Sequence, residues 1–158
     1  MLWFLKPGEL KQNFKFNEQT NIDIELDPRL LTEERVQVYA AHGVTRVSLG
    51  VQDFDDTVLK AVNREQPFSL SEKAVKLLRQ YGINDINFDL LYGLPHQTTK
   101  TMQATIIKTL KLAPNRIALF GYAHVPWMKK HMRLIDETAL PTKELRLDLF
   151  ETAQDLLT

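Results

Sequence analysis

The chain has 158 residues, of which 44% are hydrophobic and 25% are charged, a composition typical of one globular domain with a sizeable core. Its 20 basic and 20 acidic residues balance, which argues against a surface for nucleic acid or an anionic membrane. The absence of cysteine excludes disulfides, thiolate metal ligands and cysteine nucleophiles, and no apolar run approaches the length of a membrane span. We therefore expect a cytoplasmic protein that binds neither nucleic acid nor a membrane.

The first twenty residues are the least regular part of the sequence. Residues 2–5 are bulky and apolar, and they lack the basic leader and the small-residue cleavage site of a secretory signal peptide. Residues 9–16 have the spacing of one or two helical turns. Because an exposed apolar cluster promotes association, residues 2–5 are expected either to pack against the chain or to mark a point where a longer natural chain continued.

Four segments have the residue pattern of β-strands. The clearest is residues 84–92, where apolar residues alternate with Asn87 and Asp89 before a sharp turn at residues 93–95. Residues 22–26 also alternate, and Pro28 ends that strand because proline cannot donate a hydrogen bond to a sheet. The other two strands are expected at residues 44–52 and 116–124.

Helical segments separate these strands, and each begins near a residue type that caps helices. The expected caps are Thr32, then Asp53 or Asp55, then Ser69 with capping-box spacing to Glu72, then Thr98. Residues 141–142 are expected to open the last helix.

The resulting order is β-α-β-α-α-β-α-β-α, which predicts an α/β fold of parallel strands joined by right-handed crossovers. Four strands are too few for a closed barrel, so they would form either an open sheet or an arc of a larger barrel. We expect a single domain over residues 1–158, because there is no internal repeat, low-complexity tract or linker.

Each predicted strand ends in polar residues, and the carboxyl ends of parallel strands lie along one rim of a sheet. The polar residues at these ends are Glu25, Gln52, Asp89 and His124. Carboxylates suit ribose hydroxyls or an ammonium group, and Arg64, in the loop behind the second strand, suits a ligand carboxylate. Gln52 and the backbone near Ala123 suit an edge of adenine or ribose. We therefore predict a ligand site here; the alternative is that Asp89 caps the next turn or is solvated.

Several common catalytic motifs are absent from the sequence. There is no Gly-rich phosphate loop of Walker type, no G-x-G-x-x-G and no G-x-S-x-G elbow. His124 and His131 are too isolated to suggest a metal site, so each is interpreted as a hydrogen-bonding or surface histidine. No catalytic group is assigned from these residues.

Five short motifs are spread along the chain. They are Ile24-Glu-Leu-Asp-Pro28, Gly50-Val-Gln-Asp-Phe54, Val62-Asn-Arg-Glu-Gln66, Phe88-Asp-Leu-Leu-Tyr-Gly-Leu-Pro95 and Tyr122-Ala-His-Val-Pro126. Together they resemble the oxygen-independent coproporphyrinogen III oxidases, radical S-adenosylmethionine enzymes of haem biosynthesis. The resemblance runs from about residue 14 to the C-terminus, and two of the motifs are shared with related haem chaperones.

This resemblance implies an arc of a partial (β/α)6 barrel and a set of residues that bind S-adenosylmethionine. It also implies oxidative decarboxylation of two propionates of coproporphyrinogen III to vinyl groups, which gives protoporphyrinogen IX. The cationic residues Lys129, Lys130 and Arg133 are candidates to meet the propionates. The implied cofactor residues are Glu25, Gln52, Arg64, Asp89 and Ala123, with Leu91 and Phe120 as neighbouring wall contacts.

The chain departs from the family because it lacks the Cys-x-x-x-Cys-x-x-Cys motif that holds the [4Fe–4S] cluster. It also lacks the family's Gly-rich cofactor loop, and residues 1–13 fit the family poorly. We therefore expect a fragment, a truncated gene product or a half-barrel completed elsewhere, inactive as an isolated chain. An incomplete barrel leaves sheet edges unpaired, so a homodimer through an exposed edge is expected. The alternatives are a haem-chaperone-like or other non-catalytic binding module, and a remnant without binding.

Overall fold

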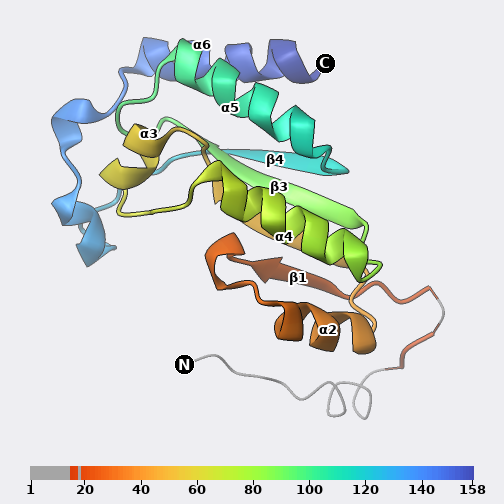
Figure 1. Cartoon of the computed structure of the whole chain (residues 1–158). Helices are drawn as coiled ribbons and strands as arrows, with labels where there is room; N and C mark the ends of the chain where they lie inside the picture. Colours follow the sequence, from red (N-terminus) through yellow and green to blue (C-terminus); the bar gives the residue numbers. More distant parts are fainter. Residues whose placement is uncertain (1–14, 18) are drawn as a thin grey trace.

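The computed structural model describes residues 15–17 and 19–158, so the predictions for residues 2–5 and 9–14 lie outside it. This part of the chain contains four parallel strands, as predicted, and the structure shows that they pair in chain order (Figure 1). They are β1 (Asp23–Leu26), β2 (Arg46–Gln52), β3 (Asp85–Tyr92) and β4 (Arg116–Gly121). The sheet is open, and it forms an arc of a partial (β/α) barrel.

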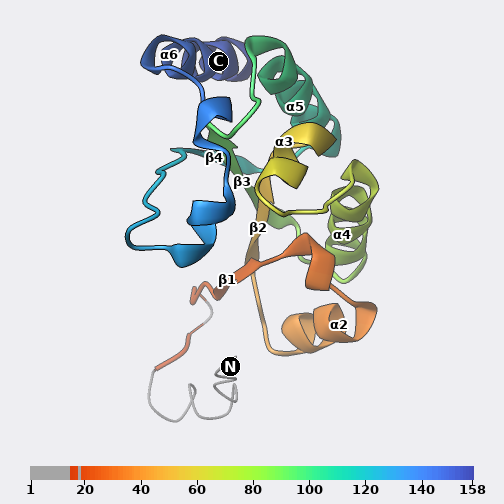
Figure 2. The same ribbon diagram turned by 90° about the vertical axis from the view of Figure 1, so that its left-hand side faces the viewer.

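Helices alternate with the strands and lie along one face of the sheet, as Figure 2 shows for α2, α4 and α5. The segment that follows β4 lies on the other side. The helices are α2 (Glu33–Ala41), α3 (Asp56–Ala61), α4 (Phe68–Gln80), α5 (Thr99–Leu112) and α6 (Lys143–Leu157), with 3-10 turns η1 (Pro28–Leu30), η2 (Lys130–Leu134) and η3 (Glu137–Ala139). Among the described residues, no helix is both long and apolar enough to span a membrane.

The hydrophobic core lies between the sheet and these helices. Ile86, Phe88 and Leu90 of β3 are at most 1% exposed, and they pack in one cluster with Val75 of α4 and Ile106 of α5. Because side chains alternate along a strand, burying these residues turns every second residue of β3 to the opposite face. The core therefore determines which polar side chains the open face presents.

The uncovered face carries a row of alternating charges across the amino-terminal half of the sheet. Arg46 of β2 binds Asp23 of β1 at 2.8 Å and Asp85 of β3 at 2.9 Å. Arg116 of β4 binds the same Asp85 oxygen at 2.9 Å. The strand register places opposite charges on neighbouring strands, so this row links all four strands.

Three of the predicted caps are confirmed, because Thr32, Asp55 and Thr98 each accept a backbone hydrogen bond at a helix start. The last helix opens at Thr142, as predicted, and Thr142 is its N-cap residue. The Ser69 capping box is wrong. Helix α4 begins at Phe68, and its N-cap residue is Pro67, whose φ of −59° already suits the start of a helix. Ser69 therefore lies inside the first turn.

The fourth strand is shorter than predicted, because β4 ends at Gly121 rather than at residue 124. Tyr122 still donates its backbone N–H to Tyr92 O at 2.8 Å, but the chain then leaves the sheet. The side chain of Tyr122 lies instead in a small apolar cluster with Val58 and Leu94.

Candidate functional site

Asp89 lies on the uncovered face of β3, and two neighbouring side chains hold its carboxylate. Ser48 Oγ donates to Asp89 Oδ2 at 2.7 Å, and Asn87 Nδ2 donates to Asp89 Oδ1 at 2.8 Å. Asn87 Nδ2 also donates to Ser48 Oγ at 2.7 Å, so the three side chains form a closed triangle. Asp89 does not cap the following turn, because Gln97 accepts the hydrogen bonds from Gly93 N and Leu94 N.

Glu25 shares this face of the sheet with Asp89. It pairs with Ser48 in the register of β1 and β2, so one strand separates the two carboxylates. Glu25 is exposed, and within residues 15–17 and 19–158 its carboxylate makes no hydrogen bond. The carboxylate therefore remains open to a ligand.

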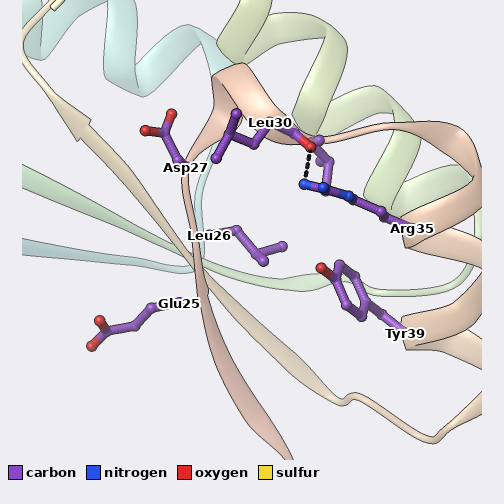
Figure 3. A pocket seen from close by; sticks show the side chains of 7 residues that line it. Glu25, Leu26, Asp27, Leu30, Arg35 and Tyr39 are labelled. Atoms are coloured by element: carbon purple, nitrogen blue, oxygen red, sulfur yellow. Dashed lines mark hydrogen bonds between the residues drawn. The ribbon is translucent and has the colours of Figure 1, made fainter. Parts of the chain in front are cut away.

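A small pocket of about 120 Å³ lies between β1, η1 and α2, and Glu25 is one of the residues that line it. Figure 3 shows Glu25 pointing away from Leu26 and Tyr39, two of the residues that line this pocket. Arg35 closes one side by donating to Leu30 O at 2.7 Å (Figure 3). Because the carboxylate points elsewhere, this pocket is not part of the predicted rim.

Gln52 reaches the uncovered face because position 50 is glycine. The pairing of β2 with β3 shifts between Gly50 and Gln52, and Gln52 adopts a φ of 70°. A Cβ atom at Gly50 would lie 3.0 Å from Gln52 Nε2 and 3.6 Å from Arg64 Nη2. Gly50 is the register partner of Asp89, so its missing side chain leaves room for both polar groups on the Asp89 face.

Arg64 is half-buried and anchored from two sides. Its Nη2 donates to Gly50 O at 2.6 Å and lies 3.4 Å from Asp27 Oδ1, while its Nε donates to Gln66 Oε1 at 2.9 Å. Burial lowers the pKa of Arg64, and the charge of Asp27 opposes that shift. Within the described residues, Nη1 has no hydrogen-bond acceptor, so one arm of the guanidinium remains for a ligand.

The pKa of Asp27, the partner of Arg64, lies below its ordinary value. Burial acts to raise it, but hydrogen bonds from Arg29 and the charge of Arg64 outweigh that effect. Arg29 binds the other Asp27 oxygen at 2.6 Å. The carboxylate is therefore ionised at neutral pH and fixes both arginines at the end of β1.

A larger pocket of about 290 Å³ lies at the carboxyl ends of the strands. Of the seven predicted site residues, Gln52, Arg64 and Leu91 line it. Its other lining residues are Arg29, Val62, Asn63, Leu94, Tyr122, His131, Met132 and Ile135. The structure thus brings together residues from the segments that follow all four strands.

The other four predicted residues lie outside the lining of this pocket. Glu25 and Asp89 lie on the sheet face, on the strands that carry the row of charges. Phe120 pairs with Leu91 across β3 and β4 and is 54% exposed, and Ala123 is exposed just beyond β4. The predicted set therefore spans one face of the sheet and its rim.

Tyr122 is a pocket residue that the sequence did not single out. It is 9% exposed, burial raises its pKa, and its hydroxyl lies 3.1 Å from His124 Nδ1. His124 Nε2 lies 3.1 Å from Glu137 Oε1, so this histidine is a hydrogen-bonding residue, as predicted. The sequence signal that could have identified Tyr122 as a pocket residue is its position as an aromatic residue directly after a strand that ends in glycine.

Of the basic residues that follow β4, only one lines the pocket. His131 of η2 lines it, whereas Lys129, Lys130 and Arg133 are exposed and do not. Arg133 donates to Pro126 O at 3.2 Å. Groups of three or more His, Asp or Glu side chains that could hold a metal ion do not occur in the described part of the chain.

Comparison with known proteins finds relatives that agree with one another. Residues 5–108 match the model of the Radical SAM superfamily. The chain is 45% identical over 149 residues to "Coproporphyrinogen III oxidase, anaerobic 1" of Cereibacter sphaeroides, covering 94% of this chain and 33% of that protein. It is 50% identical over 137 residues to an oxygen-independent coproporphyrinogen III oxidase of Helicobacter pylori, covering 87% and 30%.

Among solved structures, coproporphyrinogen III oxidase from Escherichia coli, described as a radical SAM enzyme, superposes with a TM-score of 0.91. The two sequences are 35% identical, and the match covers 96% of this chain and 35% of that one. The chain thus spans about one third of the length of the relatives that it matches.

Proposed function

Because the chain belongs to the radical SAM superfamily, we propose that it is the S-adenosylmethionine-binding part of a cytoplasmic oxygen-independent coproporphyrinogen III oxidase. The observation that carries this proposal is the arrangement of Glu25, Gln52 and Asp89 on one uncovered sheet face, with Arg64 beside them. Relatives that are 45–50% identical and bear that enzyme name support it.

The groups on this face suit the charged and polar parts of S-adenosylmethionine. The carboxylates of Glu25 and Asp89 attract its ammonium group or accept hydrogen bonds from its ribose hydroxyls. The free Nη1 of Arg64 binds its carboxylate through a charge-assisted hydrogen bond. Gln52 and the backbone of Ala123 bond the edge of adenine or ribose.

Apolar residues complete the proposed site. Leu91 and Phe120 are register partners on the same face, and they provide apolar walls for the flat adenine ring. The missing side chain of Gly50 leaves room on this face for the polar ends of Gln52 and Arg64. The residues present therefore fit the cofactor.

The residues of this chain do not fit a [4Fe–4S] cluster, because the chain has no cysteine and the cluster requires thiolate ligands. When bound with such a cluster, S-adenosylmethionine supplies the radical chemistry of the superfamily. The contribution that we assign to this chain is to bind and orient the cofactor. We propose that the complete enzyme decarboxylates the propionates of a porphyrinogen substrate, as the names of the relatives suggest.

The proposal is tested by titrating the ¹⁵N-labelled chain with S-adenosylmethionine and following backbone amides by NMR, a method that detects weak binding. We expect shifts at the amides of Gln52, Asp89 and Ala123. Asp89→Ala and Arg64→Ala should each weaken binding by about 1–3 kcal/mol, because each removes a charged hydrogen-bond partner.

Asp155→Ala is the matched control, because Asp155 is an exposed carboxylate on α6 and should not affect binding. A wild-type chain whose amides do not shift at saturating cofactor would contradict the proposal. A parallel titration with haem tests the chaperone-like alternative, because only that alternative requires haem binding.

We also propose that the chain associates through its sheet edges. Among the described residues, no strand pairs with the outer edge of β1 or of β4. Exposed edges favour pairing with a second copy of the sheet. Sedimentation of a monomer at all concentrations would contradict this part of the proposal.

A further inference from the structure

Two buried polar side chains join the turn after β2 to the turn after β3. Asp53 is 0% exposed and Gln97 is 2% exposed. Gln97 Nε2 donates to Asp53 Oδ2 at 2.6 Å. Neither residue lines the pocket of about 290 Å³, but each lies directly behind its wall.

Gln97 holds both ends of the turn that follows β3. Its Oε1 accepts from Gly93 N at 2.6 Å and from Leu94 N at 2.9 Å. Its Nε2 also donates to Leu91 O at 2.8 Å. Leu91 and Leu94 both line the pocket, so the position of this wall depends on one buried amide.

Asp53 holds the chain that follows Gln52. Its Oδ1 accepts from Phe54 N at 2.6 Å, from Asp55 N at 2.8 Å and from Thr105 Oγ1 at 2.6 Å. Gln52 adopts a φ of 70°, a conformation that side chains disfavour by about 1–3 kcal/mol unless the surroundings enforce it. The anchor at Asp53 keeps Gln52 in this conformation.

The donors and acceptors around Asp53 and Gln97 allow only one orientation of the Gln97 amide group. All four groups that contact the Asp53 carboxylate donate to it. Burial raises the pKa of Asp53, and these hydrogen bonds oppose the shift. The amides of Gly93 and Leu94 can only donate, so Gln97 must present its oxygen to them and its NH₂ to Asp53.

We propose that the Asp53–Gln97 pair is a positioning device that fixes Gln52 and Leu91 for S-adenosylmethionine, an inference that rests on the proposed function. Asp53→Asn places an NH₂ against the NH₂ of Gln97, and Gln97→Glu places two carboxylates together. Either change forces the amide or the turn to move, because a buried unpaired polar group is unfavourable. The double variant Asp53→Asn/Gln97→Glu restores a donor facing an acceptor.

The experiment measures cofactor affinity by NMR titration and the midpoint of thermal unfolding for the full 158-residue chain and its variants. Each single variant should bind S-adenosylmethionine about tenfold more weakly, and the double variant should return to within about threefold of wild type. Recovery is incomplete because Leu91 O loses its donor when residue 97 is a glutamate. Asp56→Asn and Gln103→Glu, exposed positions on α3 and α5, are the matched controls.

The outcomes separate positioning from general stability. Folded single variants that bind as tightly as wild type overturn the inference, even if they unfold at lower temperature. If the single variants do not fold, the double variant decides, and its failure to fold or to bind also overturns the inference. A wild-type chain that binds no cofactor refutes the proposed function itself, whereas equal binding by wild type and single variants refutes only the positioning role.

Discussion

Ser48 Oγ lies 2.7 Å from Asp89 Oδ2 and donates to it across the boundary between β2 and β3. The strand register makes this contact possible, because it pairs Ser48 with Asn87. Asp89 lies two residues beyond Asn87, so it is the next side chain of β3 on the same face. The Asp89 carboxylate is therefore held in one orientation before any ligand arrives. A fixed carboxylate loses less conformational entropy on binding than a mobile one.

Replacing Ser48 with alanine should weaken cofactor binding without abolishing it. The substitution removes one donor to Asp89 and leaves the donor from Asn87 in place. We expect a loss of about 0.5–1.5 kcal/mol in binding free energy, the usual contribution of one hydrogen bond. NMR titration with S-adenosylmethionine checks it, with Ser69→Ala on the exposed side of α4 as the control. Unchanged affinity in Ser48→Ala would show that the triangle does not orient Asp89 for binding.

Gly93→Ala should destabilise the fold more than Gly82→Ala. Both glycines have a positive φ, 89° and 82°, so each alanine variant carries a backbone penalty of about 1 kcal/mol. A Cβ at Gly93 would also overlap the Arg146 guanidinium, whereas a Cβ at Gly82 meets nothing within 4 Å. Because the guanidinium ends a flexible side chain, it can move aside and lose its contact with the Tyr92 ring, so we expect a difference of about 0.5–1 kcal/mol in urea-induced unfolding.

The Arg146→Ala background separates the two causes of the Gly93 effect. Once the guanidinium is removed, Gly93→Ala should carry only the backbone penalty and should match Gly82→Ala. If Gly93→Ala remained equally destabilising in that background, the overlap with Arg146 would not be its cause.

Acid should weaken the fold partly through Asp85. Hydrogen bonding from Arg46, together with the charge of Arg116, lowers the pKa of Asp85 below its ordinary value of 3.8 against a smaller opposing effect of burial. Since the folded pKa is the lower one, this stabilisation is complete above the ordinary pKa and is lost as the pH falls through the folded value. Urea unfolding at a series of pH values should therefore give a shallower acid-side slope for Asp85→Asn than for wild type. Identical slopes would show that Asp85 does not contribute to the loss of folding stability in acid.

The isolated chain should produce no 5′-deoxyadenosine after reconstitution with iron and sulfide. Without cysteine it offers no thiolate ligands for the cluster that delivers the electron. Chromatography of the reaction products with a reductant present tests this expectation, and a cluster-containing member of the superfamily serves as the positive control. Turnover by this chain alone would refute the assignment of a purely cofactor-binding role.

Much of the fold followed from local patterns. Alternation in β3 separated the buried Phe88 from the uncovered face with Asp89, and threonine caps marked two helix starts, because both signals depend only on neighbouring residues. The Ser69 cap was wrong because Pro67 starts helix α4 earlier, through its fixed backbone angle rather than through a hydrogen bond.

The role of Asp53 could not be predicted from local patterns in the sequence. Asp53 and Asp55 both follow a strand and precede a short helix, and either residue type can cap it. Only the packing of α5 and of the turn after β3 brings Thr105 and Gln97 to Asp53, across 52 and 44 residues of sequence. The choice between cap and buried anchor therefore depends on contacts that are distant in the chain.

The sequence by itself determined the order of strands and helices, the polar face of each strand and the residue types available to a ligand, since these depend on side-chain alternation and local capping. Only the tertiary structure decided that Ser48 and Asn87 orient Asp89, that Arg64 is anchored by Gly50 and Asp27, and that Asp53 is buried. The physical reason is that strand register and helix packing bring these groups together, and a hydrogen bond requires its partners to lie about 3 Å apart.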